Sequence, residues 1–416
     1  MKVTITHPTS NQLNRPVVQG LYELDMLYQF HTSVAAFPGG FLDKMSSIDQ
    51  LSDIKRRNFP KHLEPYTHTQ PLKEIGRMMA TKLGIDNLVR HETGIFSIDA
   101  LYHQFDKKIA GQLPKDLKNG LDALYHYEDG ALESFTAAKK LGIHCMYDLP
   151  IGYWRTARKM LQVEQERWPE WASTLTSLKD SEQKLQRKDD ELALAERIFV
   201  ASSFTAKTLK DYPGKLAPIE VIPYGFPKAG KTRDYNSISS GKKLKILYVG
   251  LLSQRKGIAD TFAIAENLSE FVELTVVGRK VTDDCPVLDE NLAKHEYIPS
   301  LAHKDVLSLM HANDILIFPS LFEGFGMVVS EAMSQGTPVI TTDRTAGPDI
   351  INHDENGWLI EAGSTEALQK TIEDILQKPE KIKSIGRAAR ESAKKRPWEV
   401  YGREVAEAIA KHISSK

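Results

Sequence analysis

The sequence predicts an α/β protein made of two doubly wound parallel sheets, and three observations support this fold class. A chain of 416 residues exceeds the size at which a single hydrophobic core is usual. Short apolar runs alternate with segments of helical period along most of the chain, which is typical of parallel sheets. Residues 223–241 are rich in Gly, Pro, Ser and Lys and lack apolar periodicity, so they indicate a linker between two domains.

The first series of elements runs from the start of the chain to this linker, and we expect it to form a domain over residues 1–227. Its expected strands cover residues 2–6, 32–37, 122–126, 143–149, 197–202 and 219–222. The expected helical segments begin at about Val17 and cover residues 130–141 and, as one long charged stretch, 155–196. The polar segment 43–113 has no clear periodicity, so its elements stay open.

The second series begins at Leu244 and predicts a domain over residues 240–396. Its expected strands cover residues 245–250, 273–278, 295–299, 314–320, 337–343 and 357–362. An amphipathic helix over 398–413 follows Arg396 and Pro397. Doubly wound sheets bind ligands at the carboxyl ends of their strands, so two such domains place a ligand cleft between them.

Composition excludes several classes of protein. Lys and Arg number 54 against 55 acidic residues, so there is no excess of cations for binding a nucleic-acid backbone. Cys145 and Cys285 lack metal-ligand spacing and are expected to be reduced thiols, which suggests a cytoplasmic protein. No apolar run reaches the ~20 residues of a membrane span. Peripheral membrane contact stays open, and a membrane-facing surface on the charged stretch 155–196 is conceivable, although solvated helices are the commoner outcome.

The most informative segment is FPSLFEGFGMVVSEAMSQGTPVI, residues 318–340. It predicts a buried strand, a Gly-containing loop and a helix from about Met327. Gly324 and Gly326 would let a ligand approach the backbone, and the free N–H groups of a helix start favour an anion. Glu331 lies about five residues, or ~7.5 Å, along the helix axis from the loop, where a carboxylate can accept hydrogen bonds from ribose hydroxyls. Glu323, in the loop, can reach a sugar beyond the phosphates.

The faces of this helix can also be assigned from its period. Val328, Val329 and Ala332 are expected to face the core, and the other face is expected to hold Met327, Ser330, Glu331 and Ser334. Either glutamate taken alone would more often be a solvated surface residue, so the prediction depends on the combination.

A second segment, KILYVGLLSQRKGIADTF (residues 245–262), again predicts strand, loop and helix, with Arg255 and Lys256 at the helix start. Two cations there are unfavourable for the helix, because they lie at its positive end. An anion bound at this position would explain them. Since both loops follow strands of one sheet at the same edge, they combine cations, amides and carboxylates, as a nucleotide diphosphate sugar requires.

These two segments resemble the retaining glycosyltransferases of family 4, which have the GT-B fold, over residues 244–363. Glu323 and Glu331 match the E-x7-E pair of the family, and Lys256 matches its phosphate-binding lysine. The residues 345–349 (TAGPD) and 356–360 (NGWLI) resemble its G-P-E and NG-x-L-V stretch, with Asp349 in place of the usual Glu. The resemblance implies two Rossmann-like domains facing a cleft, with residues 397–416 crossing back to complete the first domain.

The resemblance also implies roles for individual residues. Glu331 would bind the ribose, Glu323 the hexose, and the backbone at Tyr297 and Ile298 the base. The diphosphate would contact Lys256, Arg255 and the loop and helix start formed by Gly324, Phe325, Gly326, Met327 and Val328. Leu251 stands where the family often has a second basic residue, so Arg255 is expected to take that role.

In the first domain two residues are candidates. Asp148, in CMYDLPIGYW (residues 145–154), stands where the family often has a catalytic His, so it is a candidate catalytic group. Arg15 lies just beyond a predicted strand and is a candidate substrate-binding residue, although a packing role is equally compatible with its position.

We therefore predict a retaining, metal-independent hexosyltransferase without a cofactor. The donor would be a nucleotide diphosphate sugar, and UDP- and GDP-sugars are the favoured candidates. The acceptor would be a glycan, a lipid or a small molecule. Asp283-Asp284 lacks the spacing of an Asp-x-Asp metal site, so no metal is expected. The alternatives are a nucleotide-sugar epimerase of the same architecture, a non-catalytic sugar-binding protein, and a pyridoxal-dependent phosphorylase.

Overall fold

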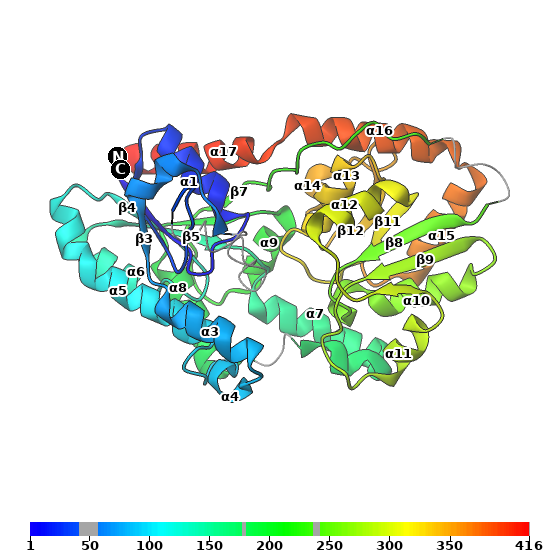
Figure 1. Ribbon diagram of the computed structural model, residues 1–416, viewed down its shortest axis with the longest axis horizontal. Helices are drawn as coiled ribbons and strands as arrows, with labels where there is room; N and C mark the ends of the chain where they lie inside the picture. The colour runs from blue at the N-terminus through cyan, green and yellow to red at the C-terminus, as the bar shows by residue number, and fades with distance from the viewer. Residues whose placement is uncertain (41–56, 177–179, 236–241, 416) are drawn as a thin grey trace.

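Two parallel sheets form the framework of the protein (Figure 1). The computed structural model describes residues 1–40, 57–176, 180–235 and 242–415. The seven-stranded sheet has the order β3-β2-β1-β4-β5-β6-β7 and the six-stranded sheet the order β10-β9-β8-β11-β12-β13. Every strand pair is parallel. The predicted fold class, two doubly wound sheets, is confirmed.

The strands of the first sheet are β1 (Val3–Thr6), β2 (Leu27–Thr32), β3 (Thr67–Thr69), β4 (Ala123–Tyr127), β5 (His144–Leu149), β6 (Arg197–Val200) and β7 (Ile219–Val221). Those of the second sheet are β8 (Leu244–Val249), β9 (Val272–Val277), β10 (Glu296–Ile298), β11 (Ile315–Phe318), β12 (Val339–Thr342) and β13 (Trp358–Ile360). The central strands are buried on both faces, which is why they read as continuous apolar runs in the sequence.

Helices cover both faces of each sheet. In the first half they are α1 (Asn14–Glu23), α3 (Leu72–Lys82), α4 (Asp86–Val89), α5 (Ile98–Lys118), α6 (Leu132–Leu141), α7 (Trp154–Arg167), α8 (Glu182–Leu194) and α9 (Ser203–Thr208). In the second half they are α10 (Ile258–Asn267), α11 (Pro286–Leu292), α12 (His303–Ala312), α13 (Met327–Ser334), α14 (Gly347–Ile350), α15 (Thr365–Gln377), α16 (Glu380–Lys395) and α17 (Trp398–Ser414). No helix among the described residues is both long and apolar enough to cross a membrane.

The C-terminal helix α17 returns to the first sheet and packs on α1, as the resemblance implied (Figure 1). The two helices touch at Gly20 and Gly402, where a Cβ on Gly20 would lie 2.3 Å from the carbonyl oxygen of Gly402. Tyr401 and Ile409 are buried in the same apolar cluster as Val17. Such close backbone contact explains why both positions are glycine.

The predicted helical stretch 155–196 contains two α-helices and is not helical throughout. α7 ends at Arg167, the turn η3 (Pro169–Thr174) follows, and α8 begins only at Glu182. Proline at 169 cannot continue the helix hydrogen bonds, and it disfavours a helical conformation for the residue before it. Trp171 in η3 is buried against the second sheet, with its ring 5.9 Å from that of Phe262. Part of the first half of the sequence therefore packs on the second domain.

The predicted strand at 32–37 is also wrong, because β2 is Leu27–Thr32. Ala35, Ala36 and Phe37 are buried as a loop that packs on the first core. Ala36 makes one isolated parallel bridge with Asn58, so the apolar character of the loop reflects burial and not membership of the seven-stranded sheet. The helix expected from Val17 begins earlier, at Asn14. The unassigned segment 43–113 contains β3, α3, α4 and most of α5, and its residues 43–56 lie outside the described part of the chain.

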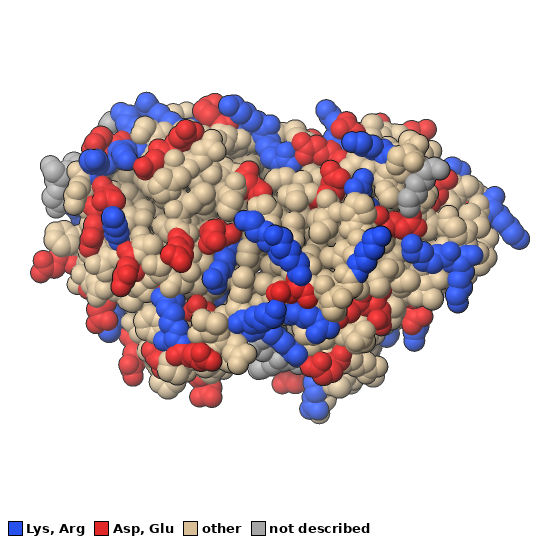
Figure 2. All heavy atoms as spheres, turned by 180° about the vertical axis from the view of Figure 1, so that it is seen from behind, with Lys and Arg blue, Asp and Glu red and all other residues tan. Residues whose placement is uncertain are grey.

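Charges of both signs are interspersed over the face shown in Figure 2, with Lys and Arg most numerous across its middle, between the two halves. This face carries no broad one-sign surface of the kind that nucleic-acid binding requires.

Candidate functional site

The two loops singled out in the sequence lie side by side. β8 pairs with β11, so the loop after each strand leaves the same edge of the second sheet. The first loop contains the turn η6 (Gln254–Lys256), and its Arg255 carbonyl accepts hydrogen bonds from the second loop. The donors are the Leu321 N–H at 2.9 Å and the Ser320 hydroxyl at 3.2 Å. The predicted meeting of the two loops is confirmed.

Two cations and one carboxylate form the centre of this edge. The Lys256 ammonium is ion-paired with the Glu323 carboxylate, and Arg255 Nη1 lies 3.5 Å from Glu323 Oε2. All three side chains are largely buried, with exposed fractions of 11%, 16% and 14% for Lys256, Arg255 and Glu323. Burial, and then the neighbouring Arg255, hold the pKa of Lys256 well below its ordinary value. A second anion at this point would favour the charged ammonium.

Arg255 is held in place by the loop that it faces. Its Nη1 donates to the Phe322 carbonyl at 2.7 Å, and burial lowers the pKa of its guanidinium. An arginine keeps its charge in such a place. The guanidinium therefore stays a fixed positive charge beside Lys256.

The helix α13 begins at this edge, directly after Gly326. Gly326 has φ +83°, and a Cβ there would lie 2.8 Å from the Phe318 ring, so both its conformation and its surroundings require glycine. α13 has eight residues and starts at Met327, as predicted. Its N-terminal amides provide hydrogen-bond donors and a partial positive charge close to Glu323.

Glu331 lies on α13 and is not a solvated surface residue. Its side chain is 9% exposed, and His303 Nε2, from the start of α12, lies 3.0 Å from Glu331 Oε1. This hydrogen bond raises the pKa of His303. The prediction of one core face and one outer face for α13 needs correction, because Ser330 and Ser334 are buried as well. The helix is enclosed on both sides since α12 and α16 pack against it.

The glycine loop also touches the first domain. A Cβ on Gly324 would lie 1.9 Å from the Pro150 carbonyl oxygen, and the Gly324 carbonyl accepts hydrogen bonds from Ser202 Oγ at 2.5 Å and Thr205 Oγ1 at 3.2 Å. Phe325 packs on Tyr224 with ring centroids 4.9 Å apart, and Met327 Sδ accepts from Gln12. The loop therefore lies at the interface of the two domains.

Asp349, which stands where the resembling family has Glu, serves this interface too. Its Oδ2 accepts from the N–H of Ser203 at 2.9 Å and from the Ser203 hydroxyl at 3.1 Å. Those donors begin helix α9 of the first domain, so the carboxylate caps that helix from the second domain.

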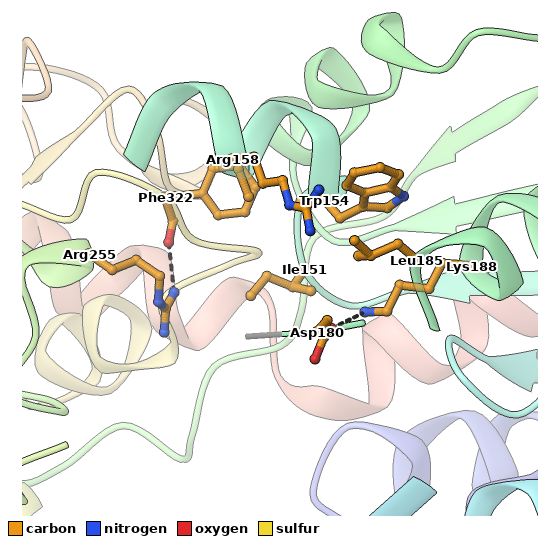
Figure 3. A pocket seen from close by; sticks show the side chains of 10 residues that line it. Ile151, Trp154, Arg158, Asp180, Leu185, Lys188, Arg255 and Phe322 are labelled. Carbon is orange, nitrogen blue, oxygen red and sulfur yellow. Dashed lines mark hydrogen bonds and ion pairs between the residues drawn. The ribbon is translucent and has the colours of Figure 1, made fainter. Parts of the chain in front are cut away.

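A cavity of about 260 Å³ opens next to Arg255, between the domains (Figure 3). Arg255 and Phe322 form its side on the second domain. The opposite side comes from the first half of the chain and is lined by Ile151, Gly152, Trp154, Ala157, Arg158, Asp180, Leu185 and Lys188. Apolar side chains such as Ile151 and Phe322 share its lining with the charged groups of Arg158, Asp180 and Lys188. Such a cavity is suited to an organic ligand with a few polar groups.

The two candidates of the first domain lie elsewhere. Asp148 is 3% exposed at the end of β5, where it accepts a hydrogen bond from the Tyr125 hydroxyl. Burial raises the pKa of Asp148 to about 7. It is enclosed by aromatic rings and does not line the cavity of Figure 3, so its catalytic role stays a prediction. Arg15 lies on α1 with its guanidinium 5.1 Å from the Phe59 ring.

Tyr297 and Ile298 form the end of the edge strand β10 and are half-buried. The Ile298 carbonyl accepts a hydrogen bond from the Gly278 N–H at 3.0 Å, which fixes the backbone of β10 against β9. A base-binding role for this backbone stays a prediction.

Two groups of side chains among the described residues could hold a metal ion. One is His144, Glu196 and His412, and the other is His91, Glu92 and Asp180. Neither includes Glu323 or Asp283, so the predicted absence of a catalytic metal stays a prediction.

Sequence reasoning missed two functional neighbours. His303 was not predicted, because its hydrogen bond to Glu331 joins two different helices, whereas helical period describes one helix at a time. Ser202, which contacts the glycine loop, was read only as the end of a strand. Its position as the N-cap of a short helix, with a Thr three residues later, was an available signal.

Comparison with known proteins agrees with this geometry. Residues 232–392 match the family model "Glycosyl transferases group 1". Glycogen synthase of Mycobacterium tuberculosis is 28% identical over 156 residues, which are 35% of this chain and 37% of the synthase. The capsular polysaccharide biosynthesis glycosyltransferase CapM of Staphylococcus aureus is 30% identical over 151 residues, 34% of this chain and 39% of CapM. The matches thus span less than half the length of these curated relatives.

Solved structures extend the likeness to the whole chain at the level of the fold. Sucrose-phosphate synthase of Thermosynechococcus elongatus superimposes with a TM-score of 0.63 at 15% identity, and the HepE protein of Anabaena in complex with UDP with a TM-score of 0.59 at 16% identity. Both alignments cover 100% of each chain. The protein has the GT-B fold, and its residues 232–392 match the model of the glycosyl transferases group 1 family.

Proposed function

We propose that this protein is a glycosyltransferase that moves a sugar from a nucleotide diphosphate sugar to an acceptor. The observation that carries the proposal is the convergence of Lys256, Arg255 and Glu323 at the amino end of α13. Two buried cations and a set of helix amides suit a diphosphate, and the nearby Glu331 suits a ribose. The solved structure of HepE with UDP supports a UDP-sugar as the first donor to test.

In the proposed reaction the diphosphate takes the place that the Glu323 carboxylate now occupies beside Lys256. The carboxylate would then be released toward the sugar, next to the anomeric carbon. Negative charge develops on the diphosphate as the glycosidic bond breaks, and Arg255, Lys256 and the α13 amides would stabilise it where it forms. Because these groups already balance that charge, the proposal includes metal independence. It also includes retention of the anomeric configuration, for which the family resemblance is the support.

A release assay tests the proposal directly. Purified protein is incubated with UDP-, GDP-, ADP- and dTDP-sugars, and free nucleoside diphosphate is measured with and without excess EDTA. We expect release from one donor class, unchanged by EDTA. Isomerised sugar without nucleotide release would instead show an epimerase. The absence of turnover with every donor, alongside measurable binding, would leave a sugar-binding protein.

Glu331→Ala should mainly raise the KM for the donor and lower kcat much less. The ribose does not change during the reaction, so its contact should be similar in the ground and transition states. The variant should also lose most of its preference for ribo over 2′-deoxyribo donors, measured as the ratio of their kcat/KM values. Glu270→Ala, at an exposed position of the same domain, is the control. An unchanged ribo preference in Glu331→Ala would show that Glu331 does not bind the ribose.

A further inference from the structure

Exposed apolar side chains are concentrated in one part of the first domain. Seven of the 14 large apolar residues that are exposed in the described chain lie between residues 72 and 98. They are Leu72, Ile75, Met79, Leu83, Ile85, Ile95 and Ile98, and we name them the α3–α4 surface. Their exposed fractions run from 42% for Ile85 to 82% for Leu72. Such a concentration of exposed apolar side chains is typical of an interaction site.

The helix α3 is amphipathic in the opposite sense from an ordinary surface helix. Leu72, Ile75, Met79 and Leu83 follow one another at helical spacing and form a single stripe that faces outward. The inward face holds Glu74, whose side chain is fully buried. Glu74 is ion-paired with Arg57 and accepts two hydrogen bonds from Arg77, each 2.8 Å long. The ion pairs therefore hold α3 on the domain with its apolar stripe outward.

The composition of the surface indicates what covers it. Six of its seven residues are aliphatic and the seventh is Met, and none is one of the aromatic residues that, with Met and Arg, are enriched at the centres of protein interfaces. Lys82 and Arg90 are exposed beside it and Lys73 is half-exposed, while Asp86 is the one exposed carboxylate of residues 72–98. Apolar side chains with a cationic rim match the headgroup and acyl boundary of an anionic bilayer. We propose that the α3–α4 surface docks this protein on anionic lipid membranes.

Docking in this orientation has a consequence for the candidate site. His91 Nε2, just after α4, lies 2.9 Å from Asp180 Oδ1, and the Glu92 carboxylate accepts from the Ser181 N–H at 2.8 Å. Asp180 also lines the cavity beside Arg255 (Figure 3). The α3–α4 unit is thus bonded to the wall of that cavity, and Figure 1 shows both helices at the edge of the first domain. If the proposed function holds, this arrangement favours an acceptor carried by a lipid.

Vesicle co-sedimentation of the full chain tests the proposal, without donor or acceptor. Wild type should partition onto vesicles of phosphatidylcholine mixed with phosphatidylglycerol and only weakly onto phosphatidylcholine alone. The partition coefficient of the triple variant Leu72→Ser/Met79→Ser/Leu83→Ser should be about tenfold or more lower than that of wild type, since the variant lacks apolar side chains that would enter the bilayer. Lys82→Gln/Arg90→Gln should lose about fivefold per cation, on the anionic vesicles only.

Val163→Ser/Phe271→Ser removes two exposed apolar side chains elsewhere and is the matched control, expected to bind as wild type does. Because the altered positions are exposed, circular dichroism and the Tm of the variants should match wild type. Equal partition of wild type and the triple variant would overturn the proposal, as would failure of wild type to bind anionic vesicles. So would light scattering that finds a wild-type dimer and a monomeric triple variant, since a second copy would then cover the surface. None of these readouts depends on sugar transfer, so the proposed function can fail separately.

Discussion

Lys256→Ala is expected to lower kcat for donor turnover by about 10²-fold or more. Removing one group that stabilises the charge of a transition state typically costs ~3 kcal/mol, and Lys256 acts in a largely buried site where such charges interact strongly. Only Arg255 and the α13 amides would then stabilise the charge of the diphosphate. The measurement is kcat and KM with the donor found in the release assay.

Lys294→Ala, an exposed lysine of the same domain, is the control and should leave kcat unchanged. The sequence alone predicts that Lys256→Ala has equal or slightly higher stability, because a cation leaves a helix start. The ion pair with Glu323 reverses that expectation, since a largely buried carboxylate loses its closest partner. We therefore expect a lower Tm. Near wild-type kcat in a folded Lys256→Ala protein would contradict a phosphate role.

Glu323→Gln should lower kcat by about tenfold or more and change the KM for the donor much less. The carboxylate is proposed to lie beside the anomeric carbon, where bonds and charge change during the reaction, so its contribution should be largest in the transition state. Glutamine keeps the size of the side chain and removes its charge. Steady-state kinetics over a range of donor concentrations separates the two constants.

The same variant should bind the free nucleoside diphosphate more tightly than wild type. In the structure the Glu323 carboxylate pairs with Lys256 and lies beside Arg255, the two cations that are proposed to bind the diphosphate. A neutral glutamine competes less well with the diphosphate for these cations. Titration calorimetry with the nucleoside diphosphate measures this difference, and Glu270→Gln serves as the control. A variant that alters KM alone would show that Glu323 only holds the sugar. Weaker binding of the diphosphate would show that the carboxylate does not compete with it.

Local sequence patterns were sufficient to predict a strand or helix where that element is buried in a regular way. The central strands of the second domain read as apolar runs because they are covered on both faces, and the glycine loop predicted the start of α13 at Met327. In the first domain the same reasoning took the buried loop at 35–37 for a strand. Burial produces apolar composition whether or not a segment pairs in a sheet, so composition alone could not separate the two.

The packing of α7 and η3 on the second domain depends on long-range contacts, which local sequence patterns do not reveal. Trp171 lies in the core of the second domain, and Arg167 is ion-paired with Asp260 across the interface. Those partners are about 90 residues apart in the chain. Helical period describes one helix at a time, so it predicted a solvated charged stretch where the structure has a bridge between domains.

By itself the sequence determined the fold class and the two loops that meet at one sheet edge. These follow from strand period, glycine positions and the rule that parallel strands end at one edge. Only the tertiary structure decided that Glu323 pairs with Lys256 and lies beside Arg255, that His303 contacts Glu331, and that α3 turns its apolar face outward. Each of these depends on which side chains from distant segments share a buried volume, where charge and desolvation, and not local propensity, set the arrangement.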